Sequence, residues 1–299
     1  MAHQTGFLWG LMAPVMVGCT AVLQDVWQPE RAAGLIRAEG VTFTMASTPF
    51  LADLTRHVAD SGTALPSLRT FLCAGAPIPG PLVEQARATL EAKIVSAWGM
   101  SENGAVTTTL PDDDDERSVN TDGKPLPGAE VKIADDDDVE LPAGEPGRLL
   151  VRTCSNFGGY LHRQHLNGTD ADGWFDTGDI ARVDDRGYVR ITGRAKDVII
   201  RGGENIPVVE IEALLYKHPA VAQVAIVAYP DDRLGERACA VVAPNAGRTL
   251  TFDAMVEFLV GQKVARQYLP ERLIVVDAMP TTPSGKIQKF KLREQVLGA

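Results

Sequence analysis

Short apolar runs alternate with longer amphipathic segments between residues 20 and 98, and this alternation restricts the fold more than any other feature of the sequence. The apolar runs predict strands at Thr20–Gln24, Val41–Ala46, Leu68–Cys73 and Ile94–Trp98. The amphipathic segments predict helices at Pro29–Ala38, Pro49–Asp60 and Pro81–Glu91. Repeated strand–helix units of this kind favour an α/β architecture in which helices cover a parallel sheet.

Two glycine-containing loops follow predicted strands of this sheet. Ala74–Pro77 comes after the strand that ends at Cys73, and Gly99–Glu102 comes after the strand that ends at Trp98. Ligands of such sheets bind outside the carboxyl ends of the strands. If the two strands are neighbours, both loops therefore face one crevice.

The stretch from Gly6 to Leu23 carries no charge and approaches the length of a membrane span. No basic residue precedes it, and Pro14 and Gly18 interrupt it. A signal peptide or a membrane-spanning helix needs flanking basic residues that are absent from this stretch. We therefore expect a buried helix followed by the buried strand at Thr20–Gln24.

The pattern changes twice further along the chain. Between Gly104 and Thr192, short alternating segments and a turn at Asp184–Gly187 predict an antiparallel sheet or barrel. From Gly193 onward, strands and helices of ordinary length predict a compact α+β module. We expect a large domain over residues 1–192 and a small one over 193–299, with its core at about 210–286.

Composition excludes several classes of protein. Acidic residues number 39 against 29 Lys and Arg, and a net charge of −10 is unsuited to non-specific nucleic-acid binding. The acidic runs Asp112–Glu116 and Asp135–Asp138 are interpreted as solvated surface loops. Four scattered cysteines give neither a zinc site nor a disulfide framework, which favours a reducing cytoplasmic location. The pair His162 and His165 is attributed to chance.

Short motifs taken one at a time say little. Ser284–Lys286 fails the phosphate-loop pattern, because Ile287 stands where a Ser or Thr is required. Gly202–Asn205 is compatible with a plain turn before a helix. Phe175–Asp179 is compatible with a tight turn between strands.

Taken together and in order, four motifs resemble the acyl-adenylate-forming (AMP-binding) superfamily of acyl-CoA synthetases, adenylation domains and luciferases. The segments that carry the resemblance are Trp98–Glu102, Gly173–Asp179, Gly193–Asp197 with Gly203–Ile206 and Glu210–Glu212, and Pro280–Lys289. The resemblance covers the whole chain. It is similar in its general run of residues to bacterial CoA ligases for medium-chain or alicyclic acids, such as cyclohexanecarboxylate–CoA ligase.

This resemblance implies an ATP-dependent carboxylate–CoA ligase. In that family a carboxylic acid attacks the α-phosphate of ATP, which gives an acyl-adenylate and pyrophosphate. The small C-terminal domain then rotates, and the thiol of coenzyme A displaces AMP to give a thioester. The implied small molecules are a carboxylic acid, ATP, AMP, Mg²⁺ and coenzyme A.

The resemblance also implies a role for individual residues. Lys286 corresponds to the mobile catalytic lysine, and Glu102 to a catalytic carboxylate that binds Mg²⁺. Lys196 corresponds to the hinge between the domains, and His3 to a residue of the acyl pocket. The CoA-binding loop corresponds to Gly202, Gly203 and Glu204. The nucleotide-binding residues correspond to Gly75, Ala76, Pro77, Trp98, Gly99, Met100, Ser101, Asp179 and Arg194.

One family element is missing from the 299 residues, namely the Ser/Thr/Gly-rich loop ending in Pro-Lys-Gly that cradles the ATP phosphates. The sequence therefore predicts an N-terminally truncated ligase with weakened adenylation, because positioning and charge stabilisation dominate this chemistry. Missing strands would also leave apolar faces exposed, including Gly6–Leu23. The alternative is a non-catalytic remnant that binds nucleotide, CoA or a partner chain. A homodimer and a separate N-terminal half are the partners left open.

Overall fold

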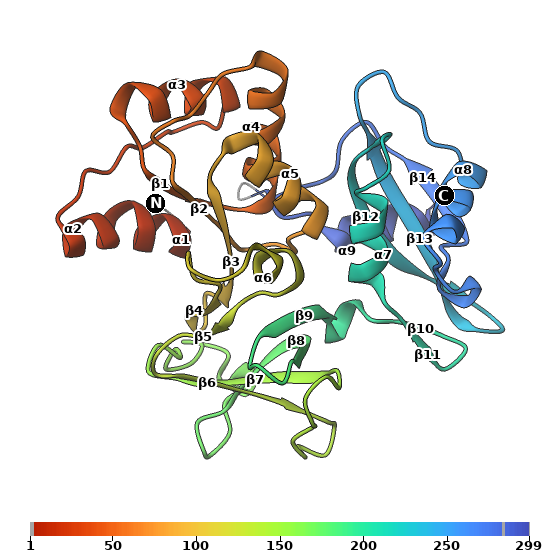
Figure 1. The fold of residues 1–299 in the computed structure, drawn as a ribbon. Coiled ribbons are helices and arrows are strands. Elements are labelled where there is room, and N and C mark those ends of the chain that lie inside the picture. Colours follow the sequence, from red (N-terminus) through yellow and green to blue (C-terminus); the bar gives the residue numbers. More distant parts are fainter. Residues whose placement is uncertain (1–2, 283–284, 299) are drawn as a thin grey trace.

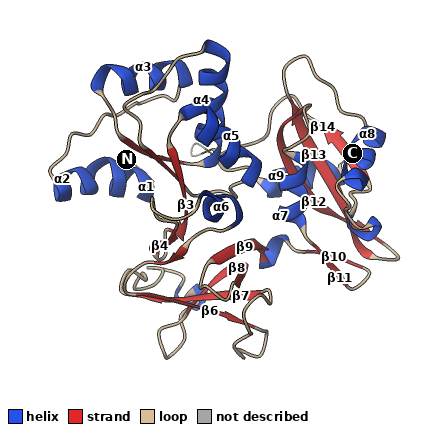
Figure 2. Ribbon diagram, viewed as in Figure 1, coloured by secondary structure: helices blue, strands red, loops and turns tan. Residues whose placement is uncertain are grey.

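The computed structural model describes residues 3–282 and 285–298, and its elements form three sheets that follow one another along the chain (Figures 1 and 2). The first has the order β1-β2-β3-β4-β5, with strands Phe43–Ala46, Thr70–Cys73, Lys93–Met100, Gly104–Thr108 and Lys124–Pro125. Its first three strands are parallel and its last two antiparallel. The two strands before the glycine loops are neighbours, since Cys73 of β2 pairs with Ser96 of β3, so the condition stated for the loops is met.

Helices α3 (Pro29–Glu39), α4 (Thr48–Ser61) and α5 (Gly80–Leu90) form the predicted cover of this sheet. Helix α4 begins with a proline in its first turn and ends at Gly62, whose φ of +67° suits a residue without a side chain. It buries one apolar face that includes Leu51, Leu54 and Val58. This packing positions the start of α4 beside the loop that follows β2.

The first helical segment differs from its prediction in two ways. Helix α1 (Gln4–Phe7), the π-helical turn η1 (Leu8–Met12) and α2 (Ala13–Val17) follow one another, and residues 19–24 form no strand. The predicted strand at Thr20–Gln24 is therefore wrong. The expected buried helix is not found at α2, where Val15, Met16 and Val17 are 73%, 77% and 72% exposed, and these values agree instead with the second expectation, that Gly6–Leu23 has exposed apolar faces. Among the described residues, no helix is long and apolar enough to cross a membrane.

The second sheet has the order β6-β7-β8-β9 and consists of strands Ala129–Ala134, Gly147–Thr153, Phe175–Val183 and Val189–Arg194. Every pairing in it is antiparallel. The sheet is open, so the antiparallel sheet is the correct choice between the two predicted alternatives. As predicted, Asp184–Gly187 forms the turn between β8 and β9. This sheet carries two of the motif segments that the resemblance singles out.

The third sheet has the order β11-β10-β13-β12, and β14 pairs with β13. Its strands are β10 (Ile199–Arg201), β11 (Glu204–Ile206), β12 (Val221–Asp231), β13 (Gly235–Pro244) and β14 (Arg272–Val275). Helices α7 (Val208–Leu215) and α8 (Phe252–Gly261) bury side chains such as Leu215 and Leu259 against one face. Helix α9 (Lys289–Leu297), which was not predicted, buries Leu292 and Val296 against the other.

The two acidic runs behave differently. The first enters α6 (Asp115–Asn120), where Asp115 forms ion pairs with Arg87 and with Lys93. It is therefore partly a structured element rather than a loop. The second, Asp135–Asp138, lies in the turn between β6 and β7 and is largely exposed, as predicted. The remaining short helical turns are η2 (Gln164–Leu166), η3 (Ala195–Asp197) and η4 (Arg266–Tyr268).

Candidate functional site

The loop after β2 is held by α4. Thr48 at the start of that helix donates from its hydroxyl to the carbonyl oxygens of Pro77 at 3.0 Å and Ala76 at 3.4 Å. Gly75 has a φ of +88°, a conformation that disfavours residues with a side chain. The sequence thus fixes residues 75–77 at the carboxyl end of the parallel strands.

The end of β3 forms a tight hairpin with β4. A Cβ atom at Gly99 would lie 2.0 Å from the carbonyl oxygen of Gly104, so only glycine fits at this position. The preceding residue, Trp98, donates from its indole Nε1 to Oδ2 of Asp179 at 2.9 Å. This bond joins the first sheet to β8 of the second, across 81 residues of sequence.

Asp179 is the most enclosed carboxylate of this region, with 3% of its surface exposed. Its Oδ1 accepts from Nε of Arg194 on β9 at 2.7 Å, while Oδ2 accepts from Trp98. Burial raises the pKa of Asp179 above the usual aspartate range, and the Arg194 charge and the Trp98 hydrogen bond partly oppose that shift. The chain therefore holds a buried carboxylate between one cationic and one neutral donor.

Lys286 approaches the same carboxylate from the C-terminal end of the chain. Its segment is folded back on itself, since the backbone N–H of Lys286 donates to Oγ1 of Thr282 at 3.1 Å. A Cβ at Gly285 would lie 2.9 Å from Cγ of Pro49, which shows how closely this turn packs on α4. Burial and the Arg194 charge lower the pKa of Lys286, whereas Asp179 raises it. Pro283 and Ser284 of the predicted motif lie outside the described residues.

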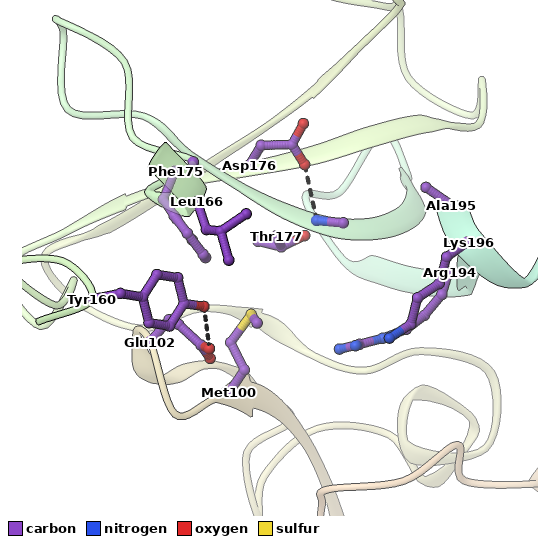
Figure 3. A pocket seen from close by; sticks show the side chains of 12 residues that line it. Met100, Glu102, Tyr160, Leu166, Phe175, Asp176, Thr177, Arg194, Ala195 and Lys196 are labelled. Carbon is purple, nitrogen blue, oxygen red and sulfur yellow. Dashed lines mark hydrogen bonds between the residues drawn. The ribbon is translucent and has the colours of Figure 1, made fainter. Parts of the chain in front are cut away.

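A pocket of about 520 Å³ opens between these elements (Figure 3). Glu102 lines it, and its Oε1 accepts from the hydroxyl of Tyr160 at 2.7 Å. This hydrogen bond raises the pKa of Tyr160, which keeps the hydroxyl protonated and able to donate. The lining residues are Met100, Glu102, Tyr160, Leu166, Gly168, Phe175, Asp176, Thr177, Gly178, Arg194, Ala195 and Lys196.

The donor set limits how a divalent cation could be held. Among the described residues, no group of three His, Cys, Asp or Glu side chains is arranged to bind a metal ion. Glu102 therefore fits Mg²⁺ only as a single carboxylate, with substrate oxygens and water completing the shell. Sites of this kind are usual for Mg²⁺, which often takes one or two carboxylates together with substrate phosphates.

Four of the predicted residues line this pocket, namely Met100, Glu102, Arg194 and Lys196, and Asp179 joins Trp98 to Arg194 beside it. Lys196 lines the pocket on η3, next to Arg194. Gly202–Glu204 forms the turn from β10 into β11 in the third sheet, and none of its residues lines the pocket. His3 is exposed, and its Nδ1 accepts from the backbone N–H of Thr5 at 3.3 Å. In these positions neither the predicted CoA loop nor the predicted acyl-pocket histidine lines this pocket.

Sequence reasoning missed Tyr160 as a member of the site. It follows two glycines in a loop after β7, where no hydrophobic period distinguishes it. The only signal is an aromatic residue in a polar, glycine-containing segment, which is too common to single out. Its hydroxyl contacts Glu102, which lies 58 positions away in the sequence.

Comparison with known proteins identifies the family. Residues 1–161 match the model of AMP-binding enzymes, and residues 210–286 match the model of the AMP-binding enzyme C-terminal domain. The medium-chain fatty-acid–CoA ligase of Escherichia coli is 37% identical over 99% of this chain and 53% of its own length. A salicylyl-CoA synthase of Streptomyces is 38% identical over 97% of this chain and 53% of its own length.

Solved structures give the same result. The ATP-bound structure of MatB from Rhodopseudomonas palustris superposes with a TM-score of 0.89 at 28% identity, covering 98% of this chain and 58% of that one. An anthranilate CoA ligase in complex with anthranoyl-AMP has the same TM-score and identity, covering 98% of this chain and 57% of its own. The chain spans about half the length of the relatives it matches. It belongs to the AMP-binding enzyme family, as do its E. coli and Streptomyces relatives, which are named as a fatty-acid–CoA ligase and a salicylyl-CoA synthase.

Proposed function

We propose that this chain carries out the chemistry of an AMP-forming carboxylate–CoA ligase. A carboxylate oxygen of the acid attacks the α-phosphorus of ATP, and the bond to pyrophosphate breaks. The sulfur of coenzyme A then attacks the acyl carbon, the bond to AMP breaks, and the thiol proton is lost. The observation that carries the proposal is the buried Asp179, held by Trp98 and Arg194 with Lys286 nearby, beside the pocket that contains Glu102.

In this proposal Asp179 accepts hydrogen bonds from both ribose hydroxyls of the nucleotide. Its buried carboxylate is suited to this role because hydrogen bonds to a charged acceptor are stronger than neutral ones. Arg194 holds Asp179 and contacts ribose and phosphate. The adenine lies against residues 75–77, whose small size lets backbone approach a flat ring, and Trp98 flanks it. Gly99, Met100 and Ser101 complete the nucleotide site.

Lys286 supplies positive charge where negative charge develops during attack on phosphorus. Its charge interactions with Asp179 and Arg194 support this role, and Arg194 lines the pocket in which the phosphate is proposed to lie. Glu102 would hold Mg²⁺, which when bound neutralises phosphate charge. Glu102, through Mg²⁺, and Lys286 would thus act on the phosphates of ATP from two different parts of the fold.

The second step is proposed to use a different arrangement of the same chain. Lys286 and the turn at Gly202–Glu204 both lie within the proposed small domain, residues 193–299. Lys286 lies near Asp179, whereas the turn lies in the third sheet outside the pocket. Rotation of the small domain about Lys196 would withdraw Lys286 from the site and bring the turn at Gly202–Glu204 to the acyl-adenylate. His3 is proposed to face the acyl group.

The acid is proposed to be a medium-chain or alicyclic carboxylic acid, and the location cytoplasmic. The E. coli relative named above supports the medium-chain class at 37% identity. The Streptomyces relative, named for salicylate, makes an aromatic acid the main competitor. A panel containing octanoate, cyclohexanecarboxylate and salicylate separates these classes.

The test is acid-dependent pyrophosphate release by the 299-residue chain, with the E. coli medium-chain ligase as a positive control. Release that depends on one acid of the panel, and that Lys286→Ala abolishes, supports the ligase. Lys291→Ala is the matched control, since Lys291 is exposed on α9 and does not line the pocket. Equal loss in both variants would contradict a direct role for Lys286.

A second candidate is a nucleotide-binding chain without turnover. It takes account of the span of the chain, which covers about half the length of the relatives it matches. Such a chain would bind AMP in calorimetry, and Asp179→Asn would weaken that binding. It would release no pyrophosphate with any acid of the panel under conditions in which the positive control turns over.

A further inference from the structure

Tyr160 and Glu102 form a hydrogen-bonded pair that the predicted site does not contain. The tyrosine hydroxyl donates to Oε1 of the carboxylate at 2.7 Å, and both side chains line the pocket (Figure 3). The bond engages Oε1 alone. Glu102 lies in the turn between β3 and β4, whereas Tyr160 lies in the loop after β7, so the pair spans two sheets.

The loop around Tyr160 is itself anchored on both sides. The backbone N–H of Tyr160 donates to Oδ1 of Asn167 at 2.8 Å. Its ring packs edge-on against Phe157 with centroids 4.8 Å apart, and Phe157 packs edge-on against Phe175 of β8 at 5.4 Å. These contacts fix where the hydroxyl lies before any ligand arrives.

The backbone of Glu102 is tied to the same loop. The N–H of Phe157 donates to the carbonyl oxygen of Glu102 at 2.6 Å. The loop therefore holds Glu102 at two points, through its carbonyl and through its carboxylate. A long, half-exposed glutamate otherwise has three rotatable bonds, and holding it in one rotamer removes that freedom before binding.

We propose that Tyr160 is a positioning residue that fixes one oxygen of the Glu102 carboxylate and thereby presents the other to a divalent cation bound with the nucleotide phosphates. The proposal rests on the proposed function, because it requires Glu102 to meet a metal–nucleotide complex. Outer partners that orient a ligating side chain typically contribute 10–100-fold to metal affinity, as a general order of magnitude. Tyr160 touches neither metal nor substrate in this scheme.

The experiment measures the affinity of the full chain for ATP by calorimetry, once with excess Mg²⁺ and once with EDTA. The ratio of the two dissociation constants is the gain in affinity due to Mg²⁺. We expect Tyr160→Phe to reduce this gain about 10-fold while leaving the affinity in EDTA unchanged, because the ring and its packing are retained. Glu102→Gln is expected to abolish the gain.

The chain supplies a matched control in Tyr188. Its hydroxyl donates to Oδ1 of Asp113 at 2.8 Å, which is the same type of bond at a distance from the pocket. Tyr188→Phe should leave the Mg²⁺ gain unchanged. A merely structural role for Tyr160 would instead lower ATP affinity equally with and without Mg²⁺.

Three results would overturn the proposal. One is an unchanged Mg²⁺ gain in Tyr160→Phe, and another is an equal loss in Tyr188→Phe. The third is an unmodified chain that shows no Mg²⁺ gain. AMP binding in EDTA distinguishes these failures from failure of the proposed function. If the chain binds AMP but shows no Mg²⁺ gain, only the proposed role of Tyr160 is wrong. Absence of AMP binding removes the nucleotide site and this proposal with it.

Discussion

The carboxylates of Asp179 and Glu102 belong to one candidate site but have opposite surroundings. Asp179 is almost fully buried, and a guanidinium and an indole N–H each engage one of its oxygens, whose remaining lone pairs can accept further hydrogen bonds. Glu102 is half-buried, receives one bond from a neutral hydroxyl, and borders an open pocket. A carboxylate whose partners are built into the fold is suited to recognise a fixed group such as a sugar. A carboxylate such as that of Glu102, in which the bond from Tyr160 engages one oxygen, is suited to bind an incoming cation through the other oxygen.

A first expected difference between the two carboxylates is in stability. Asp179→Asn removes the charge opposite Arg194. Breaking a buried ion pair costs about 3–5 kcal/mol, and because the Arg194 side chain is 31% exposed we expect a loss of about 2 kcal/mol in the free energy of unfolding. Glu102→Gln should cost less than about 1 kcal/mol. Urea unfolding of the two variants and the parent chain measures both values.

The same pair of variants should also differ in nucleotide affinity. Losing the charged acceptor for two ribose hydroxyls is expected to weaken AMP binding about 100-fold in Asp179→Asn. Glu102→Gln should bind AMP as the parent does when no metal is present. If both substitutions have the same effect on stability and on AMP affinity, the distinction between a built-in and an open carboxylate is wrong.

How much of this site can be predicted from the sequence depends on how far apart in the chain the contacting residues lie. Residues 29–98 were predicted well, because helix and strand periods are local and β2 and β3 follow one another in the sheet. The two glycine loops follow these neighbouring strands, which meets the condition stated for them in the sequence analysis. The Trp98–Asp179 bond and the Tyr160–Glu102 bond join residues 81 and 58 positions apart in different sheets. Family motifs brought the first pair under notice, but no pattern marked Tyr160.

Burial was the property predicted least well. The apolar stretch at α2 resembles a core helix in composition, yet Val15, Met16 and Val17 face outward because nothing described packs on that side. Helix α9, in contrast, has a polar composition and was missed, although it buries Leu292 and Val296 four residues apart. Composition states what a segment could bury, whereas the available partner surface decides what it does bury.

The pH dependence of AMP affinity is a second test of the contrast between the two carboxylates, because this affinity is expected to change about tenfold per pH unit. Asp179 must be ionised to accept the ribose hydroxyls, and burial raises its pKa above the usual range. AMP affinity should therefore fall as the pH drops through that raised pKa, about tenfold for each further unit. In Asp179→Asn this acidic limb should disappear. Calorimetry in EDTA across the acidic range provides the measurement, and an acidic limb that persists in the variant would assign it to another group.

At alkaline pH, the rate of pyrophosphate release should instead depend on whether Lys286 is charged. Burial and Arg194 lower the pKa of this lysine, so it loses its charge at a lower pH than an exposed lysine does. Pyrophosphate release should decline as the pH rises through that value, while AMP affinity stays constant because the ribose carboxylate remains ionised. Lys286→Arg, which stays charged, should move the decline to higher pH. A parallel decline of AMP affinity would point to the nucleotide contacts rather than to the lysine.

Trp98→Phe is expected to have a smaller effect than Asp179→Asn, because it keeps an aromatic ring beside the nucleotide and removes only one bond to Asp179. A hydrogen bond to a charged group contributes about 1.5–3 kcal/mol, and rearrangement of the half-buried neighbours should place the loss in stability near the lower figure. Because the indole N–H lowers the pKa of Asp179, its removal should raise that pKa further and shift the acidic limb of AMP binding to higher pH. Tyr160→Phe, which removes one neutral donor from the other carboxylate, is the matched control and should leave this limb where it is. If the two substitutions moved it equally, Trp98 would have no special part in holding Asp179, and the two carboxylates would differ only in their exposure.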